Sequence, residues 1–109
     1  MKIIVNESRL NRIIKSYILD KFGEFYHVYD EDPTQYYNIL GFFSKSENEP
    51  PTVKVATAEG KNVAAIDRIL YYIIFNLFSF EDVEELNPYI QDVILDVTGI
   101  KIHDILTMR

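Results

Sequence analysis

The sequence predicts an α+β fold in a single domain, residues 1–109. Apolar residues near the N-terminus recur every three or four positions, which is typical of one face of a helix. Two aromatic and β-branched runs follow, at 24–30 and 35–43, and an alternating run at 52–57, which is typical of strands. The last third of the chain returns to helical spacing. We therefore expect an N-terminal helix and C-terminal helices packed on a small antiparallel sheet.

The first long element is predicted to be a helix over about residues 8–22. Asn6 is a suitable N-cap, Glu7 places negative charge near the positive end of the helix dipole, and Gly23 suits the position after the last turn. Before this helix, the β-branched run at 3–5 favours a short edge strand. The apolar face of the helix consists of Leu10, Ile13, Ile14, Tyr17, Ile18 and Phe22.

The two aromatic runs are predicted to form a hairpin, because the residues between them, 31–34, have turn composition. The segment 44–51 is polar and ends in two prolines, which indicates a loop. The alternating run at 52–57 is expected to be a third strand with one solvent-facing side.

The segment 63–80 has the longest apolar run in the chain. Its length favours a helix that is capped by Asn62 and runs to about Phe78, whereas the side chains of 71–75 favour a strand. We predict the helix, because the polar residues fall near one side. A helix this apolar must be largely buried or covered by a partner.

Two short helices and a last strand are predicted at the C-terminal end. Ser79 with Asp82 fits a capping box that opens a helix to about Leu86. Asn87-Pro88 fits the cap and first position of a second helix that Gly99 ends. The alternating segment 100–103 is expected to return as a strand.

Charge and composition exclude several classes of function. Seventeen Asp and Glu against eleven Lys and Arg give a formal net charge of −6. Binders of nucleic acid and of anionic membranes gain affinity from positive charge, so we expect neither as a partner. The absence of cysteine excludes disulfide scaffolds, zinc ribbons and thiol nucleophiles. Gly60-Lys61 lacks the glycine-rich loop of a Walker motif, and we expect no cofactor.

The two histidines are candidate centres of acid–base or metal chemistry. His27 has acidic neighbours in sequence, but strand geometry sends His27 and Asp30 to opposite faces, which favours a solvated hairpin tip. His103 and Asp104 are consecutive and have no second histidine nearby. We therefore predict no catalytic and no metal-binding residue. The acidic residues around His27 are Glu24, Asp30, Glu31 and Asp32.

The aromatic content indicates association with another protein. Eight Tyr and seven Phe, with aromatics on both faces of the hairpin, are more than we expect a 109-residue domain to cover internally, and such side chains are enriched at interfaces. A second candidate surface is basic and lies on successive turns of the first helix, at Arg9, Arg12 and Lys15; it is either a docking face or an ordinary solvent-exposed side. The aromatic interface candidates are Tyr26, Tyr36, Tyr37, Phe42, Phe43, Tyr71 and Tyr72.

The segment Ile3-Ile4-Val5-Asn6-Glu7-Ser8-Arg9-Leu10-Asn11-Arg12-Ile13-Ile14 resembles the start of many small uncharacterised proteins of tailed bacteriophages, especially marine T4-like ones. Those proteins often begin with a short apolar strand, then Glu-Ser, then a basic amphipathic helix. The resemblance covers about the first twenty residues. Fifteen Ile and four Ala also suit an AT-rich genome. The resemblance implies a phage origin and no particular activity. With no signal peptide and no long apolar run, we expect the protein in the host cytoplasm or in the virion.

Three functions are therefore considered. The first is a non-enzymatic structural or accessory protein that acts as a homo-oligomer or inside a larger assembly. The second is an acidic binding protein or inhibitor that occupies a basic surface of a host protein. The third is a small hydrolase or lyase that uses His27 or His103 with carboxylates. We predict the first, because the chain carries surplus aromatic surface and no chemical motif.

Overall fold

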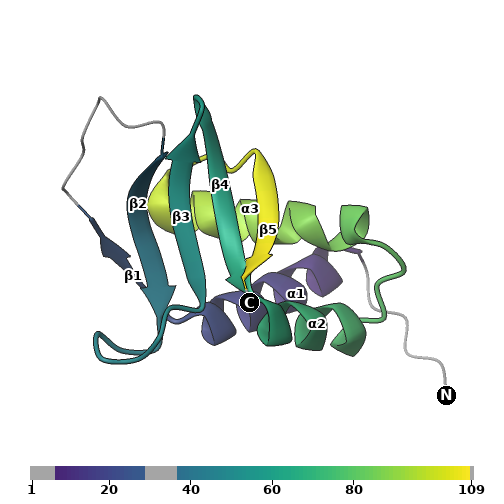
Figure 1. Cartoon of the computed structure of the whole chain (residues 1–109). Coiled ribbons are helices and arrows are strands. Elements are labelled where there is room, and N and C mark those ends of the chain that lie inside the picture. Colours follow the sequence, from purple (N-terminus) through teal and green to yellow (C-terminus); the bar gives the residue numbers. More distant parts are fainter. Residues whose placement is uncertain (1–6, 29–36, 109) are drawn as a thin grey trace, which may run out of the picture.

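The computed structural model describes residues 7–28 and 37–108 (Figure 1). The strand predicted at 3–5 and the turn predicted at 31–34 lie outside these residues. In chain order the elements are α1 (Glu7–Phe22), β1 (Glu24–His27), β2 (Tyr37–Ser44), β3 (Val53–Ala58), β4 (Lys61–Asp67), α2 (Arg68–Leu77), α3 (Val83–Thr98) and β5 (Asp104–Met108).

The five strands form one sheet in the order β1-β2-β3-β4-β5. β1, β2 and β3 pair antiparallel, as the predicted hairpin and third strand require; β4, which was not predicted, pairs antiparallel with β3, and β5 joins β4 in parallel. The sheet is therefore mixed and not purely antiparallel. A parallel neighbour requires a crossover, and α2 and α3 supply it. The α+β class is confirmed, with helices at the N-terminus and in the C-terminal region.

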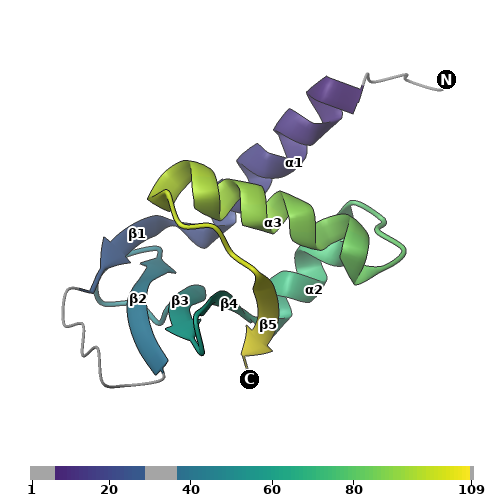
Figure 2. The ribbon, with the colours of Figure 1, turned by 90° about the horizontal axis from the view of Figure 1, so that it is seen from above.

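The helices cover one face and one end of the sheet, while within the described residues no helix covers the opposite face (Figures 1 and 2). One cross-strand row points to the helices and is fully buried at Phe43, Val53 and Ile66. The next row along the strands therefore points away from the helices, because successive side chains alternate. On the helical side the core is closed by buried residues of all three helices: Ile14, Ile18, Phe22, Tyr71, Ile74, Leu86, Ile90, Val93 and Ile94.

A tight turn joins α1 to β1 at Gly23. This glycine has φ +89°, a left-handed conformation that side-chain-bearing residues disfavour. The backbone of Ser44 approaches so closely that a Cβ on Gly23 would lie 2.3 Å from the Ser44 carbonyl oxygen. On the other side of the turn, the Thr52 hydroxyl lies 2.6 Å from the carbonyl oxygen of Phe22. The end of α1 is thereby fixed against both β2 and β3.

The helix predicted for 63–80 is correct only in part. Lys61–Asp67 is strand β4, and the chain passes directly into α2 at Arg68. The side chain of Asp67 accepts a hydrogen bond from the backbone N–H of Leu70 at 2.9 Å and so caps α2. Asn62 is therefore not a helix cap. The segment 71–75, whose sequence favours a strand by propensity and a helix by length, is helical.

The C-terminal predictions need three corrections. One helix, α3, replaces the two short ones, with Asp82 as its N-cap; Ser79 lies in the preceding turn with φ 55°. α3 continues through Pro88 because Leu86 and Ile90, on either side of it, are both fully buried. The last strand is 104–108 and not 100–103. Gly99 ends α3 in the left-handed conformation, as predicted. In the described part of the chain no helix has the length and apolarity needed to cross a bilayer.

Candidate functional site

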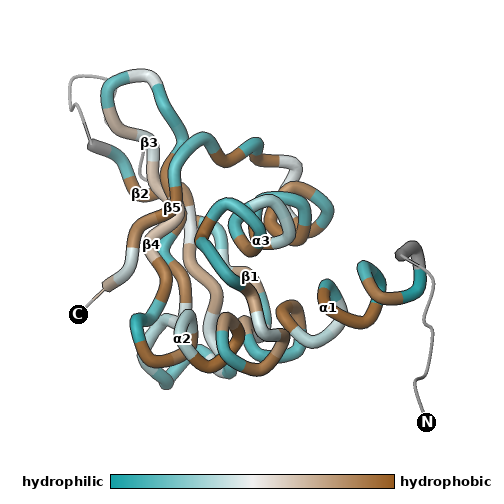
Figure 3. The backbone as a smooth tube through the Cα atoms, turned by 90° about the vertical axis from the view of Figure 1, so that its right-hand side faces the viewer, coloured by the Kyte–Doolittle hydropathy of each residue, from teal (hydrophilic) through white to brown (hydrophobic). Residues whose placement is uncertain are grey.

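Helix α2 carries large apolar residues on its exposed side as well as on its buried side, with the polar Arg68 and Asn76 also exposed. Tyr71 and Ile74 pack in the core, yet the other side also carries large apolar residues. Most of the α2 tube is correspondingly coloured as hydrophobic in Figure 3. A helix of a small globular protein normally turns a polar side to solvent. We call the exposed side the α2 face; its members, with their exposed fractions, are Ile69 72%, Tyr72 49%, Ile73 49% and Leu77 54%.

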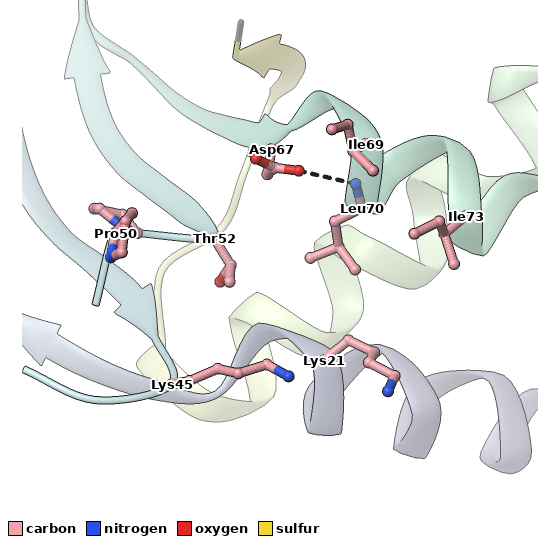
Figure 4. Close-up of a pocket in the computed structure, with 9 residues that line it drawn as sticks. Lys21, Lys45, Pro50, Thr52, Asp67, Ile69, Leu70 and Ile73 are labelled. Carbon is pink, nitrogen blue, oxygen red and sulfur yellow. Dashed lines mark hydrogen bonds between the residues drawn. The ribbon is translucent and has the colours of Figure 1, made fainter. Parts of the chain in front are cut away.

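A pocket of about 300 Å³ adjoins the first turn of α2. Its walls come from α2, from the end of α1 and from the loop between β2 and β3, and Figure 4 shows Ile69 and Ile73 across from Lys21 and Lys45. Among the described residues neither lysine forms an ion pair, although the Lys21 ammonium lies 5.4 Å from the centre of the Tyr17 ring. An apolar floor therefore meets two lysines and the carboxylate of Asp67, the N-cap of α2, at this end of the α2 face.

The opposite end of α2 is acidic. The turn into α3 and its first helical turn expose four carboxylates, which lie where the positive end of the α3 dipole favours negative charge. Val83, among them, is 50% exposed. We call this group the acidic turn; it consists of Glu81, Asp82, Glu84 and Glu85.

The uncovered face of the sheet is a second candidate surface. Its central row runs across all five strands through Tyr26, Phe42, Lys54, Ala65 and Leu106. The rings of Tyr26 and Phe42 stack with their centres 5.4 Å apart, and both side chains are half-buried. Burial raises the pKa of the Tyr26 hydroxyl above its ordinary value, and the nearby Glu24 carboxylate raises it further.

The predicted aromatic interface is divided by the fold. Tyr72 lies on the α2 face, and Tyr26 and Phe42 lie on the uncovered face of the sheet. Phe43 is fully buried against Phe22, and Tyr71 is 5% exposed, so neither is available to a partner in this fold. Tyr36 lies outside the described residues, and for Tyr37 only the backbone in β2 is described.

The predicted basic docking face is partly neutralised. Lys15 forms an ion pair with Asp92 of α3 at 3.3 Å. Arg12 is exposed and lines a hollow of about 150 Å³ between α1 and α3, together with Lys15 and Asp96. Arg9 is exposed nearer the start of α1, where the helix extends away from the sheet (Figure 2). The three residues therefore do not form one isolated basic surface.

His103 has a structural role in the fold. Its Nδ1 accepts a hydrogen bond from the backbone N–H of Asn62 at 3.0 Å, and its own backbone N–H donates to the Asn62 carbonyl at 2.8 Å. The Asn62 side chain in turn donates to the Lys101 carbonyl at 2.9 Å. The imidazole thus holds the segment before β5 to the start of β4.

His27 lies at the end of β1, and its ring packs edge-on against the Phe25 ring with the two ring centres 4.7 Å apart. Of the acidic residues near it in sequence, Asp30, Glu31 and Asp32 lie outside the described residues, and Glu24 accepts a hydrogen bond from the Tyr26 hydroxyl. Within residues 7–28 and 37–108, no three His, Asp or Glu side chains lie close enough together to hold a metal ion.

The sequence did not indicate Ile69, Ile73 and Leu77 as surface residues. The signal that could have found them is the apolar run at 69–75, continued at Leu77 after Asn76, which is too long for one side of a helix to bury. No protein-family model, no curated protein and no solved structure matches the chain. The resemblance of the first twenty residues to phage proteins therefore stays a prediction.

Proposed function

We propose that this protein is non-enzymatic and works by protein–protein association, as a homo-oligomer or within a larger assembly. The observation that carries the proposal is the α2 face, four large apolar side chains that a ten-residue helix turns to solvent. Leaving such side chains in water costs about 25 cal/mol for each Å² of apolar surface. A partner that covers them recovers this free energy, and contiguous exposed apolar surface is typical of interaction sites.

The test is the native mass of the protein, measured by light scattering after size exclusion at several concentrations and at low and moderate salt. We expect a mass above the 12.8 kDa of one chain, and a shift toward 12.8 kDa in Leu77→Asp. Leu95→Asp is the matched control, because Leu95 is a 41% exposed leucine on α3, away from the α2 face. A mass of 12.8 kDa at every concentration would contradict self-association.

The acidic turn supports a second candidate function, an acidic protein or inhibitor that occupies a basic surface of a host protein. Carboxylates grouped at one exposed site attract a basic partner, and the attraction weakens as salt screens it. A host protein captured on the immobilised chain would then elute with moderate salt and would no longer bind the variant Glu81→Lys/Glu84→Lys. Capture that resists salt and survives these substitutions would contradict this function.

A further inference from the structure

The three aliphatic residues of the α2 face lie on one row of the helix. Ile69, Ile73 and Leu77 are spaced four residues apart, so they form a single ridge with Ile73 at its centre. In a two-fold symmetric contact, if residue i of one copy touches residue j of the other, then j also touches i. An antiparallel second copy would therefore place Ile73 against itself and Ile69 against Leu77 of the other copy.

From this arrangement we propose that two copies of the chain associate through their α2 faces, with the two helices antiparallel and a two-fold axis near Ile73. The inference rests on the proposed function and names its occupant, a second copy of this chain. On this axis the two ridges face each other, and each of the three aliphatic side chains contacts an aliphatic side chain of the other copy.

The charges at the two ends of α2 favour the same arrangement. Lys21, Lys45 and Arg68 stand beside its first turn and outnumber the one carboxylate there, Asp67, which caps the helix; the acidic turn follows its last turn. Antiparallel packing brings the basic end of each copy toward the acidic turn of the other. Parallel packing would bring like charges together. Two chains that each carry a net charge of −6 repel overall, so this local complementarity decides the orientation.

The size of the α2 face predicts a weak dimer. The four side chains of the α2 face expose on the order of 400 Å² of surface that a partner could cover, because a large side chain buries about 150–250 Å² when fully covered. A standard interface buries roughly 800 Å² on each partner, so the charged ends must take part for the contact to approach that size. We therefore expect dissociation in the micromolar range, with stronger association at low salt.

The first experiment is disulfide cross-linking, which this chain permits because it has no cysteine of its own. Residue 73 is expected to meet itself on the axis, so Ile73→Cys should form a covalent dimer readily on mild oxidation. Ile69→Cys and Leu77→Cys should each cross-link poorly alone and readily when mixed. Leu95→Cys, at a 41% exposed position on α3, is the control for random collision.

The second experiment measures the affinity by analytical ultracentrifugation. Ile73→Glu should raise the dissociation constant by about 100-fold or more, because symmetry places both substituted side chains in the contact and central residues dominate an interface. The charge reversals Lys21→Glu/Lys45→Glu and Glu81→Lys/Glu84→Lys should each weaken the homodimer. An equimolar mixture of these two variants should restore a dimer, since both of its end contacts then pair opposite charges.

The outcomes separate this inference from the proposed function. Self-cross-linking at 73 with restored dimers in the mixture would support the two-fold contact. An oligomer that ignores Ile73→Glu and does not cross-link at 73 would overturn it while leaving association in place, with the uncovered sheet face as the surface to test. A mixture that assembles beyond dimers would overturn the two-fold symmetry. A wild-type chain that stays monomeric at every concentration would refute self-association itself.

Discussion

The turn at Gly23 offers a direct test of how closely α1, β1 and β2 are packed. In Gly23→Ala the new methyl group meets two costs. A left-handed conformation costs a residue with a side chain about 1–2 kcal/mol. The contact at 2.3 Å from the Ser44 carbonyl oxygen must also be relieved, and because that atom belongs to the backbone, the strand itself has to shift. Overpacking of this kind costs about 1–3 kcal/mol. We expect a total loss of about 2–5 kcal/mol in the free energy of unfolding.

Gly99→Ala is the matched control, because Gly99 has φ 75° but nothing within 4 Å of an added Cβ. It should lose only the conformational term, about 1–2 kcal/mol. Urea unfolding followed by circular dichroism measures both variants, and at a slope of about 1–3 kcal/mol/M the two midpoints should be clearly separated. If the two variants lose the same free energy, the close approach of Ser44 to Gly23 is refuted.

Three further substitutions test other parts of the fold. Tyr71→Phe removes a 2.8 Å hydrogen bond from the Tyr71 hydroxyl to Asn87 and should cost about 1 kcal/mol. Burial raises the pKa of Tyr71 in the folded state, and the neighbouring Tyr72 raises it further. The contribution of Tyr71 to the free energy of unfolding is therefore complete below the unfolded pKa near 10 and declines as the pH rises through the folded pKa. If Tyr71→Phe leaves unfolding at high pH unchanged, this reasoning is contradicted. Asn62→Ala should speed hydrogen exchange in β4 and β5 but not between β2 and β3, and uniform exchange would argue against its local role. Pro88→Ala restores a backbone donor at an exposed helix position and should stabilise by about 1–3 kcal/mol; a loss of stability would contradict a net cost of Pro88 in α3.

The elements that the sequence predicted correctly are those with one dominant local signal. α1 has an apolar face, polar residues on its other side and a glycine after its last turn, so periodicity alone identifies it. β2 and β3 are rich in aromatic and β-branched residues and are separated by a proline-containing loop. In both cases local propensity and burial favour the same structure.

The errors arise where a strand runs into a helix without a turn. Residues 63–66 include two alanines and two β-branched residues, which suit a helix as well as a strand, and β4 becomes helical directly after Asp67. In the structure this segment pairs on one side with 53–58, across a two-residue turn, and on the other with 104–108, some forty residues away; no local pattern contains the second partner. Pro88 led to the prediction of a second helix for a similar reason: the burial of Leu86 and Ile90 on either side depends on the tertiary fold, and it offsets the cost of a proline inside α3.

The sequence could not place the candidate surfaces in the fold. The large number of aromatic residues predicted association through aromatic side chains. Phe43 and Tyr71, however, are buried in the core, and the exposed side of α2 is largely aliphatic. The polar Arg68 and Asn76 of α2 are exposed, and Ile69, Ile73 and Leu77 are exposed with them.

The parallel position of β5 has a consequence for the order of folding. β2, β3 and β4 are joined by short connections and can pair soon after collapse, but Val63 cannot pair with Asp104 until the chain between them has formed α2 and α3. Until then β4 is an edge strand whose unpaired backbone N–H and C=O groups can pair with another chain. We expect refolding to pass through a species in which this edge is open to other chains, so the yield of refolded protein should fall as its concentration rises.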